Sequence, residues 1–457
     1  MAIAKPDSWS HKNKDMTRNL LNSKKAVKEF FKNGKEASLW ALVRDYYSLA
    51  EDEKRELLAM ISQYSFSYDD FCKMANLLLK GEGPASHWQE RLRTLRASLI
   101  SPRERFFKSF VNIRGGLKFL LDLRGDLLRL GTRMEGIDWR ETDQDIVFLL
   151  DMWFLEGFLS LSEIGLDTPY HQISFIKEHD MVHPMTSVEE MVKRLGKDRL
   201  CYGLYHVLLP HEPIIFIEVA LADRIIGSIT EIMEVTKPIE RPDTAIFYSI
   251  NNTQQGLSGL GLGKILIAGV VEGIRGKYPH IKNFSTLSPI PGLWKKYMDP
   301  LLKRESIFKM KPEMIERYFP EKWKETILSH YRAGGGREKD FLKVLHEILA
   351  DTKWIEDKIY VKHLGDPLKS IVYFYLTEEK NDKDKPLDPV ANFHIENGAS
   401  LSLNYVRFMG NTYEYGVRDS LSFMVNYIYH IHWLEHIKET LPSLMGKIKF
   451  VFPSKKV

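Results

Sequence analysis

The chain has 457 residues, 44% of them hydrophobic and 28% charged, and its formal net charge is +4. This length exceeds the usual size of one hydrophobic core, so about two or three domains are expected. The composition is that of a globular protein, and so small a net charge gives no argument for a nucleic-acid partner. Two cysteines, Cys72 and Cys201, are too few for a disulfide framework and fit a reducing compartment.

The first thirty-five residues are strongly basic, with eight Lys and one Arg against three acidic residues. They lack the apolar run and cleavage site of a secretory signal, and they are not the arginine-rich type of an organelle import peptide. A charged terminus of this kind predicts a solvated arm ahead of the first helix. Because no sorting signal is recognised, the expected location is cytoplasmic.

The sequence between about residues 18 and 150 is helical in character. Segments such as "GGLKFLLDLRGDLLRLGTRM" repeat apolar residues at spacings of three and four, with charges between them. A helical bundle is therefore predicted as a first domain, residues 1–154. The most apolar run, "IVFLLDMWFLEGFLSLSEIG", contains Asp151 and Glu156, so no membrane partner is expected.

The pattern changes in residues 155–457. "CYGLYHVLLP" and "HEPIIFIEVALADRI" are short, aliphatic and joined by "PHEP", which predicts two strands and a turn. "TAIFYSI" and "IKNFSTLS" repeat the pattern with a helix between them. Such alternation predicts an α/β domain with a mostly buried, mixed central sheet, and the whole chain is expected to be α+β.

A glycine-rich turn joins strand and helix in "TAIFYSINNTQQGLSGLGLGKILIAGVV", with Gly256, Gly259, Gly261 and Gly263. Glycines at such a junction let the backbone approach a ligand, and the free amides of the first helical turn favour phosphate. The spacing fits neither the dinucleotide motif nor the triphosphate loop. It resembles the pyrophosphate-binding turn of the Gcn5-related acetyltransferase fold, which binds coenzyme A, although Ser258 stands where those proteins usually have Arg or Gln. Tight strand–helix packing is the alternative reading.

Three motifs, taken in order, resemble the malonyl-CoA decarboxylase family: "TQQGLSGLGLG", "FSTLSPIPGLWK" and "DPVANFHIENGA". Supporting matches in "GGLKFLLDLRGDLL", "RLGKDRLCY" and "FMVNY" extend the resemblance over about residues 110–430. The resemblance implies an N-terminal helical domain that mediates oligomerisation, as a dimer or tetramer, and a catalytic domain of the acetyltransferase fold. It also implies malonyl-CoA as the substrate.

The resemblance also implies the residues of the site. Ser288 and His394 are the implied catalytic pair. Possible carboxylate-binding or supporting groups are Asn397, Ser420 and Tyr427. The implied coenzyme A phosphate-binding residues are Ser258, Gly259, Leu260, Gly261, Leu262, Gly263 and Lys264.

The chemistry of the residues agrees with this reading. Loss of CO2 leaves two electrons that the thioester carbonyl takes up as an enolate, so we expect no organic cofactor and no metal. The chain contains no CxxC or HExxH ligand set. His394 titrates in the right range to donate a proton, while Ser288 can bond the malonyl carboxylate or relay the proton. The sequence leaves their individual roles open.

Two other functions are compatible with the same turn. An acyltransferase of this fold would move the acyl group to an amine, which requires an acceptor channel and a base for the amine. A non-catalytic coenzyme A-binding module would keep the turn and have no need of Ser288 and His394.

Overall fold

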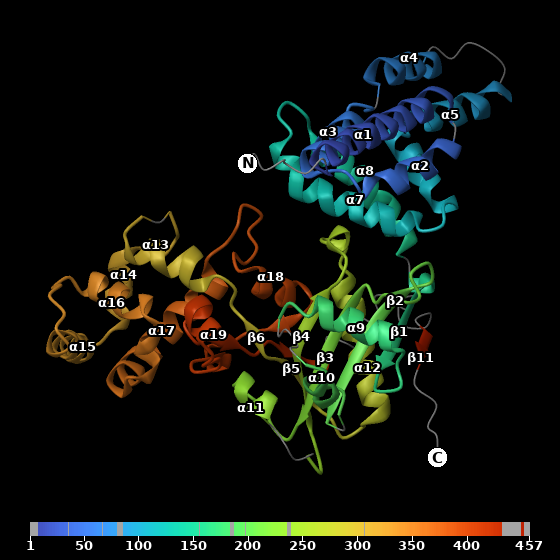
Figure 1. Ribbon diagram of the computed structural model, residues 1–457. Helices are drawn as coiled ribbons and strands as arrows, with labels where there is room; N and C mark the ends of the chain where they lie inside the picture. The colour runs from blue at the N-terminus through green and yellow to red at the C-terminus, as the bar shows by residue number, and fades with distance from the viewer. Residues whose placement is uncertain are drawn as a thin grey trace, which may run out of the picture. The chain divides into compact units, whose positions relative to one another are not determined.

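The computed structural model describes residues 8–34, 36–65, 67–79, 86–154, 156–182, 187–196, 198–234, 239–305, 307–431 and 449–451 (Figure 1). The chain divides into two compact units. The helical unit comprises the residues up to Leu159 together with His206–Pro210 and Asn252–Gly261. The mixed unit comprises Ser160–Tyr205, His211–Asn251 and the residues from Leu262 onward.

The helical unit confirms the bundle predicted from periodicity. Its helices are α1 (Ser8–Asn33), α2 (Ala37–Tyr46), α3 (Glu51–Ser62), α4 (Tyr68–Leu79), α5 (Ser86–Ser98), α6 (Pro102–Lys108), α7 (Gly116–Leu130) and α8 (Trp139–Trp153). An aromatic cluster lies in its core. Phe106 packs edge-on against Phe30 and Phe110, with ring centroids 5.2 Å apart in both pairs, and Phe110 contacts Phe119 at 4.8 Å. Such offset contacts add to the burial of the rings.

The basic N-terminal segment is not a solvated arm over its whole length, so that prediction is wrong. Residues Ser8–Asn33 form α1, which packs against α2. Leu20, Val27 and Phe30 recur at the spacing of one helix face, and each is buried. The hydrophobic effect on this face therefore outweighs the repulsion among the lysines, of which Lys25, Lys28 and Lys32 are exposed.

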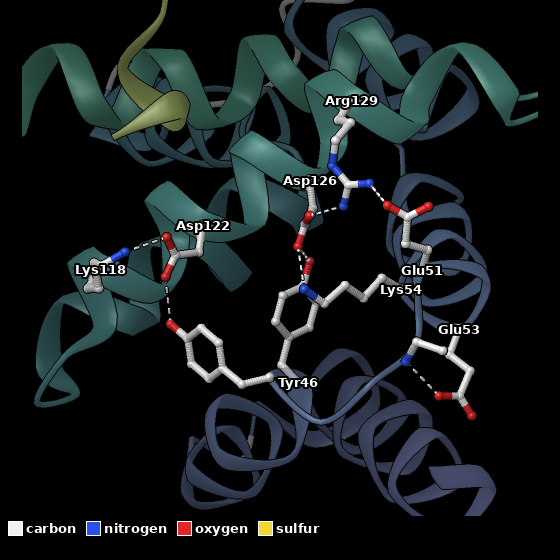
Figure 2. A network of polar contacts seen from close by, with 10 residues as sticks. Tyr46, Glu51, Glu53, Lys54, Lys118, Asp122, Asp126 and Arg129 are labelled. Atoms are coloured by element: carbon white, nitrogen blue, oxygen red, sulfur yellow. Dashed lines mark hydrogen bonds and ion pairs between the residues drawn. The ribbon is translucent and has the colours of Figure 1, made fainter. Parts of the chain in front are cut away.

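One face of α7 binds α2 and α3 through a polar network (Figure 2). Asp126 accepts hydrogen bonds from Tyr46 Oη (2.9 Å), Lys54 Nζ (2.8 Å) and Arg129 Nη2 (2.6 Å). One turn earlier, Asp122 accepts a bond from Lys118 Nζ at 2.6 Å. Burial alone would raise the pKa of Asp126, but the bonds from Lys54 and Arg129 outweigh burial and lower it. The carboxylate thus stays charged and joins three helices.

The mixed unit confirms the predicted mixed sheet. The strands are β1 (Leu159–Ile164), β2 (Arg199–His206), β3 (Ile215–Ala222), β4 (Thr244–Asn252), β5 (Asn283–Thr286), β6 (Ser288–Pro289), β7 (Ala399–Ser400), β8 (Val406–Arg407), β9 (Met424–Val425), β10 (Ile428–Tyr429) and β11 (Lys449–Val451). The large sheet has the order β11-β1-β2-β3-β4-β5-β10-β7, and a small sheet has the order β6-β9-β8. β4 and β5 are parallel, whereas β2 and β3 are antiparallel.

The helices of the mixed unit lie between its strands in the chain. They are α9 (Tyr170–His179), α10 (Val188–Arg194), α11 (Ile229–Glu234), α12 (Leu262–Lys277), α13 (Asp299–Leu302), α14 (Pro312–Tyr318), α15 (Glu321–Ala333), α16 (Phe341–Ala350), α17 (Lys358–Glu378), α18 (Pro389–Glu396) and α19 (Glu414–Ser420). Every residue of β2 and β3 is buried, as in a sheet covered on both faces. α13 to α17 pack mainly on one another, between β6 and α18 in the chain (Figure 1). No described helix has the length and apolarity that crossing a bilayer requires.

Candidate active site

Ser288 lies where the chain passes from the large sheet to the small one. β5 ends at Thr286 in the large sheet, and β6 begins at Ser288 in the small sheet. Between them, Leu287 N–H donates to Phe247 O at 3.0 Å and so continues the ladder with β4. Pro289 restricts the backbone on the other side. The serine hydroxyl is therefore carried by a constrained segment.

His394 lies in the last turn of α18, a short helix with a well-formed start. The Asp388 carboxylate caps the helix by accepting the N–H groups two and three residues further on, at 3.0 and 2.7 Å. Pro389 occupies the first helical turn, and Gly398, with a φ of 87°, follows the helix end. Capping at both ends fixes the short helical segment that carries His394.

The fold brings Ser288 and His394 together although 106 residues separate them. Ser288 Oγ and His394 Nε2 are 3.1 Å apart, and Nδ1 of the same ring lies 2.9 Å from Tyr429 Oη. Ser288 Oγ also donates to Thr286 Oγ1 at 3.0 Å. Both ring nitrogens are thus engaged by hydroxyl groups.

A single assignment of protons satisfies all the hydrogen bonds around this pair. Thr286 Oγ1 donates to the carbonyl of Val425 at 3.3 Å, so it accepts the proton of Ser288. Ser288 Oγ then accepts from His394, which assigns the imidazole proton to Nε2. Nδ1 is left as the acceptor for the Tyr429 hydroxyl. In this assignment a transferable proton lies directly beside the serine oxygen.

The pair is buried among aromatic rings. His394 is 4% exposed and Ser288 6%. Tyr427 stacks on the imidazole with ring centroids 4.7 Å apart, and Phe393 meets it edge-on at 5.1 Å. Burial lowers the pKa of His394 to about 3, because the cation would lose its hydration there. The imidazole of the free protein is therefore neutral near pH 7.

In the helical unit, the glycine turn uses its glycines for two different reasons. A side chain at Gly256 would bring its Cβ to 2.0 Å from the carbonyl oxygen of Leu121 on α7, so this position needs close packing. Gly259 and Gly261 have φ values of 83° and 68°, with open space around them. There glycine is needed for the left-handed backbone rather than for packing. The two readings of the turn thus apply to different glycines.

In the mixed unit, the start of α12 packs closely on α18. A Cβ at Gly263 would lie 2.6 Å from both the Phe393 ring and Asn397 Nδ2. Asn397 is 6% exposed and follows α18 directly. The structure therefore joins two of the predicted binding residues, Gly263 and Asn397, beside the helix that carries His394.

The remaining predicted residues lie in different environments. Ser258 and Lys264 are exposed, Leu260 is half-buried and Leu262 is buried. Ser420 is buried and donates to Gly416 O (3.0 Å) within α19, a contact that does not involve the Ser288–His394 pair. In the part of the chain that the structure describes, no three His, Cys, Asp or Glu side chains form a possible metal site.

Sequence reasoning missed Thr286, Tyr429 and the helix-capping Asp388. Thr286 precedes Ser288 by two residues, and Tyr429 follows Tyr427 by two. Along extended backbone a spacing of two places side chains on one side, so this spacing was a usable signal. The Asp-Pro pair at the start of α18 is likewise a recognised helix start.

The comparisons with known proteins agree with these features. The model of the malonyl-CoA decarboxylase C-terminal domain matches residues 157–450, and that of the malonyl-CoA decarboxylase N-terminal domain matches residues 75–154. The chain is 34% identical over 340 residues to the mitochondrial malonyl-CoA decarboxylase of Anser anser anser, which covers 73% of this chain and 65% of that protein. For the Rattus norvegicus protein of the same name the identity is 32% over 344 residues, covering 74% and 67%. The match thus spans about two thirds of these relatives.

Solved structures extend the likeness over nearly the whole chain. The crystal structure of malonyl-CoA decarboxylase from Rhodopseudomonas palustris has a TM-score of 0.73 and 27% identity, covering 95% of this chain and 98% of that chain. That from Agrobacterium vitis has a TM-score of 0.72 and 26% identity, with the same coverage. With both family models matched over adjoining ranges, the chain belongs to the malonyl-CoA decarboxylase family.

Proposed function

We propose that this protein decarboxylates malonyl-CoA to acetyl-CoA and CO2, with Ser288 and His394 delivering the proton. The observation that carries the proposal is the buried hydrogen bond between Ser288 Oγ and His394 Nε2, at 3.1 Å, in a member of the malonyl-CoA decarboxylase family. The relatives that bear this name support the substrate.

The reaction needs few groups from the protein. The bond between the α-carbon and the carboxylate breaks, CO2 leaves, and the electron pair enters the thioester as an enolate. The α-carbon then takes one proton, and the carbonyl re-forms. Because the thioester is itself the electron sink, the proposal includes no metal and no organic cofactor.

The proton route follows from the contacts of the imidazole. Nδ1 is engaged by Tyr429 and Nε2 by Ser288, so the serine oxygen is the atom that passes a proton onward. We assign Ser288 as the group that protonates the α-carbon and His394 as the group that reprotonates Ser288. Thr286 holds the serine hydroxyl until it turns toward substrate.

The charge of His394 changes when substrate enters in this scheme. In the free protein burial keeps its pKa at about 3 and the ring neutral. A malonyl carboxylate in the same low-dielectric site would raise that pKa and favour the imidazolium. Its position in the last turn of α18 also favours a positive charge. Substrate and one proton are thus taken up together, and the proton ends on acetyl-CoA.

Coenzyme A is proposed to bind through residues 258–264, with its phosphates toward the amides of the turn. The left-handed conformations of Gly259 and Gly261 support a backbone shaped for a ligand. β5 leaves the large sheet after Thr286, whereas β4 runs on to Asn252. Asn397 and Tyr427 remain proposed contacts of the acyl end, and Ser420 a more remote one.

Two further expectations remain predictions. The helical domain, residues 1–154, is proposed to mediate a dimer or tetramer, which light scattering on the purified protein would test. A cytoplasmic location is also a prediction; the names of the goose and rat relatives refer those two proteins to mitochondria.

The test is the reaction with malonyl-CoA as the sole substrate. Release of CO2 with equal formation of acetyl-CoA is the expected result, and prior treatment with a chelator should leave the rate unchanged. Turnover that depends on an added amine would instead identify an acyltransferase. Tight coenzyme A binding without any turnover would identify a non-catalytic binding module.

A further inference from the structure

Arg124 of α7 is a buried guanidinium that binds the glycine turn. Its Nη1 donates to the carbonyl oxygens of Gly256 (2.5 Å) and Ser258 (2.9 Å). Its Nε donates to Asp143 of α8 at 2.7 Å. Arg124 is 3% exposed, and all of these residues belong to the helical unit. The arginine therefore connects two helices of the bundle to the turn.

The surrounding backbone is built for this contact. Gly256 lies against Leu121 with no room for a side chain, and a Cβ at Gly125 would touch Gln255 at 3.4 Å. Leu121 and Gly125, which are one helical turn apart on α7, thus form the surface on which the glycine-rich turn packs. Arg124 lies next to Gly125 in the same helix. This face differs from the Asp122–Asp126 face that binds α2 and α3 (Figure 2).

The hydrogen bond to Ser258 O orients the peptide that follows. In a planar trans peptide the carbonyl of one residue and the N–H of the next point in opposite directions. With Ser258 O directed at Arg124, the N–H of Gly259 is directed away from α7. Gly259 is exposed and has a left-handed φ of 83°. The amide therefore faces the side where an anion can approach.

Asp143 prevents the arginine itself from being a free phosphate ligand. Its carboxylate accepts bonds from Nε and, at 3.5 Å, from Nη2, while both Nη1 protons are used by the two carbonyls. The rigid fork of the guanidinium suits this combination of one carboxylate and two carbonyls, which a lysine cannot reproduce.

We propose that Arg124 is a positioning residue through which the helical unit sets the affinity for the phosphate-bearing part of coenzyme A. The proposal rests on the proposed function, because it takes the turn to be the phosphate site. It assigns the helical unit a role in substrate binding in addition to the proposed role of the helical domain in assembly.

The test compares malonyl-CoA with malonyl-pantetheine, which lacks the nucleotide and its diphosphate. For Arg124→Lys we expect kcat/KM with malonyl-CoA to fall about 10- to 100-fold, mainly through KM, since bonds to charged groups are worth about that factor. With malonyl-pantetheine the change should stay within about twofold, because no phosphate is bound. Calorimetric affinities for coenzyme A and pantetheine should show the same contrast without any turnover.

Arg103 provides a matched control. It is 2% exposed, bonds to Asp145 of α8 at 2.8 Å and donates to the carbonyl of Ser62 at 2.8 Å, yet it does not touch the turn. Arg103→Lys should lower the melting temperature and leave the preference for malonyl-CoA over malonyl-pantetheine unchanged. If Arg124→Lys does not fold, Asp143→Asn should show the same loss of preference to a smaller extent.

The outcomes separate this proposal from the proposed function. Equal losses on both substrates in the Arg124 variant, or a wild-type protein with no preference for malonyl-CoA, would overturn the positioning role while decarboxylation stands. A wild-type protein that binds coenzyme A without decarboxylating would overturn the proposed function. The affinity contrast in Arg124→Lys would then still support the role of the arginine.

Discussion

Removal of the Tyr429 hydroxyl should slow the reaction while leaving substrate binding nearly intact. Tyr429 is 2% exposed, and its Oη is 2.9 Å from His394 Nδ1. In Tyr429→Phe the ring still fills its site, but Nδ1 loses its partner in a buried position. Such an unpaired group costs about 1 to 3 kcal/mol. The imidazole of His394 then loses the contact that fixes its tautomer and direction for proton transfer. We therefore expect the cost to appear in the transition state rather than in substrate binding.

At about 1.4 kcal/mol per tenfold in rate, this cost corresponds to a fall in kcat of about 5- to 150-fold. KM for malonyl-CoA should change less than about threefold, because Tyr429 contacts the imidazole rather than the proposed coenzyme A site. Steady-state assays of acetyl-CoA formation give both constants.

Tyr205→Phe is the control for this prediction. Tyr205 lies in β2, is 6% exposed and donates to Gln172 Oε1 at 3.1 Å, away from His394. Loss of this hydrogen bond should lower the free energy of unfolding by about 1 kcal/mol and leave kcat unchanged. A folded Tyr429→Phe protein with kcat within twofold of wild type would refute the reasoning.

Three further changes test other parts of the structure. Burial, reinforced by the charge of Asp180, raises the pKa of Glu218 to about 8, so the folded state holds a proton that the unfolded state releases. The stability that this proton adds is complete below about pH 4.5 and is lost as the pH rises through 8. The loss is up to about 1.4 kcal/mol per pH unit. Urea denaturation between pH 5 and 9 should show this loss in wild type and not in Glu218→Gln. Gly259 has a φ of 83°, so Gly259→Ala should lower the free energy of unfolding by about 1 to 2 kcal/mol in the same denaturation assay and raise KM for malonyl-CoA. An unchanged free energy and an unchanged KM would show that no left-handed residue is needed there. Asp388→Ala should lower stability by about 0.5 to 2 kcal/mol in melting experiments and lower kcat, because the helix loses its cap. Asp388→Asn keeps a capping oxygen and should stay near wild type. Equal losses of stability in both variants would contradict the capping role.

Periodicity was enough to predict the helical unit and the main strands, because each depends on side chains close together in the sequence. It failed for α1, where the count of lysines was given more weight than the spacing of Leu20, Val27 and Phe30. The exposed Lys25, Lys28 and Lys32 lie on the solvated face of an amphipathic helix. Charge alone therefore does not separate an arm from a helix.

The site divides in the same way between local and long-range features. Motifs identified Ser288 and His394, and the structure places them 3.1 Å apart. The partners Thr286 and Tyr429 depend on how β5, β6, β9 and β10 are paired, which a single sequence does not specify. The contact of Arg124 with Ser258 spans 134 residues, and no local pattern states which carbonyl a buried arginine will reach.

Single-turnover decarboxylation of malonyl-CoA by wild type, Ser288→Ala, His394→Asn and the double variant tests the central claim most directly. A proton relay predicts that each single change slows acetyl-CoA formation by about 10²- to 10⁴-fold. Because the two groups act as one unit, the double variant should be no slower than the slower single variant. Single variants within twofold of wild type, or losses that multiply in the double variant, would contradict a relay through this pair.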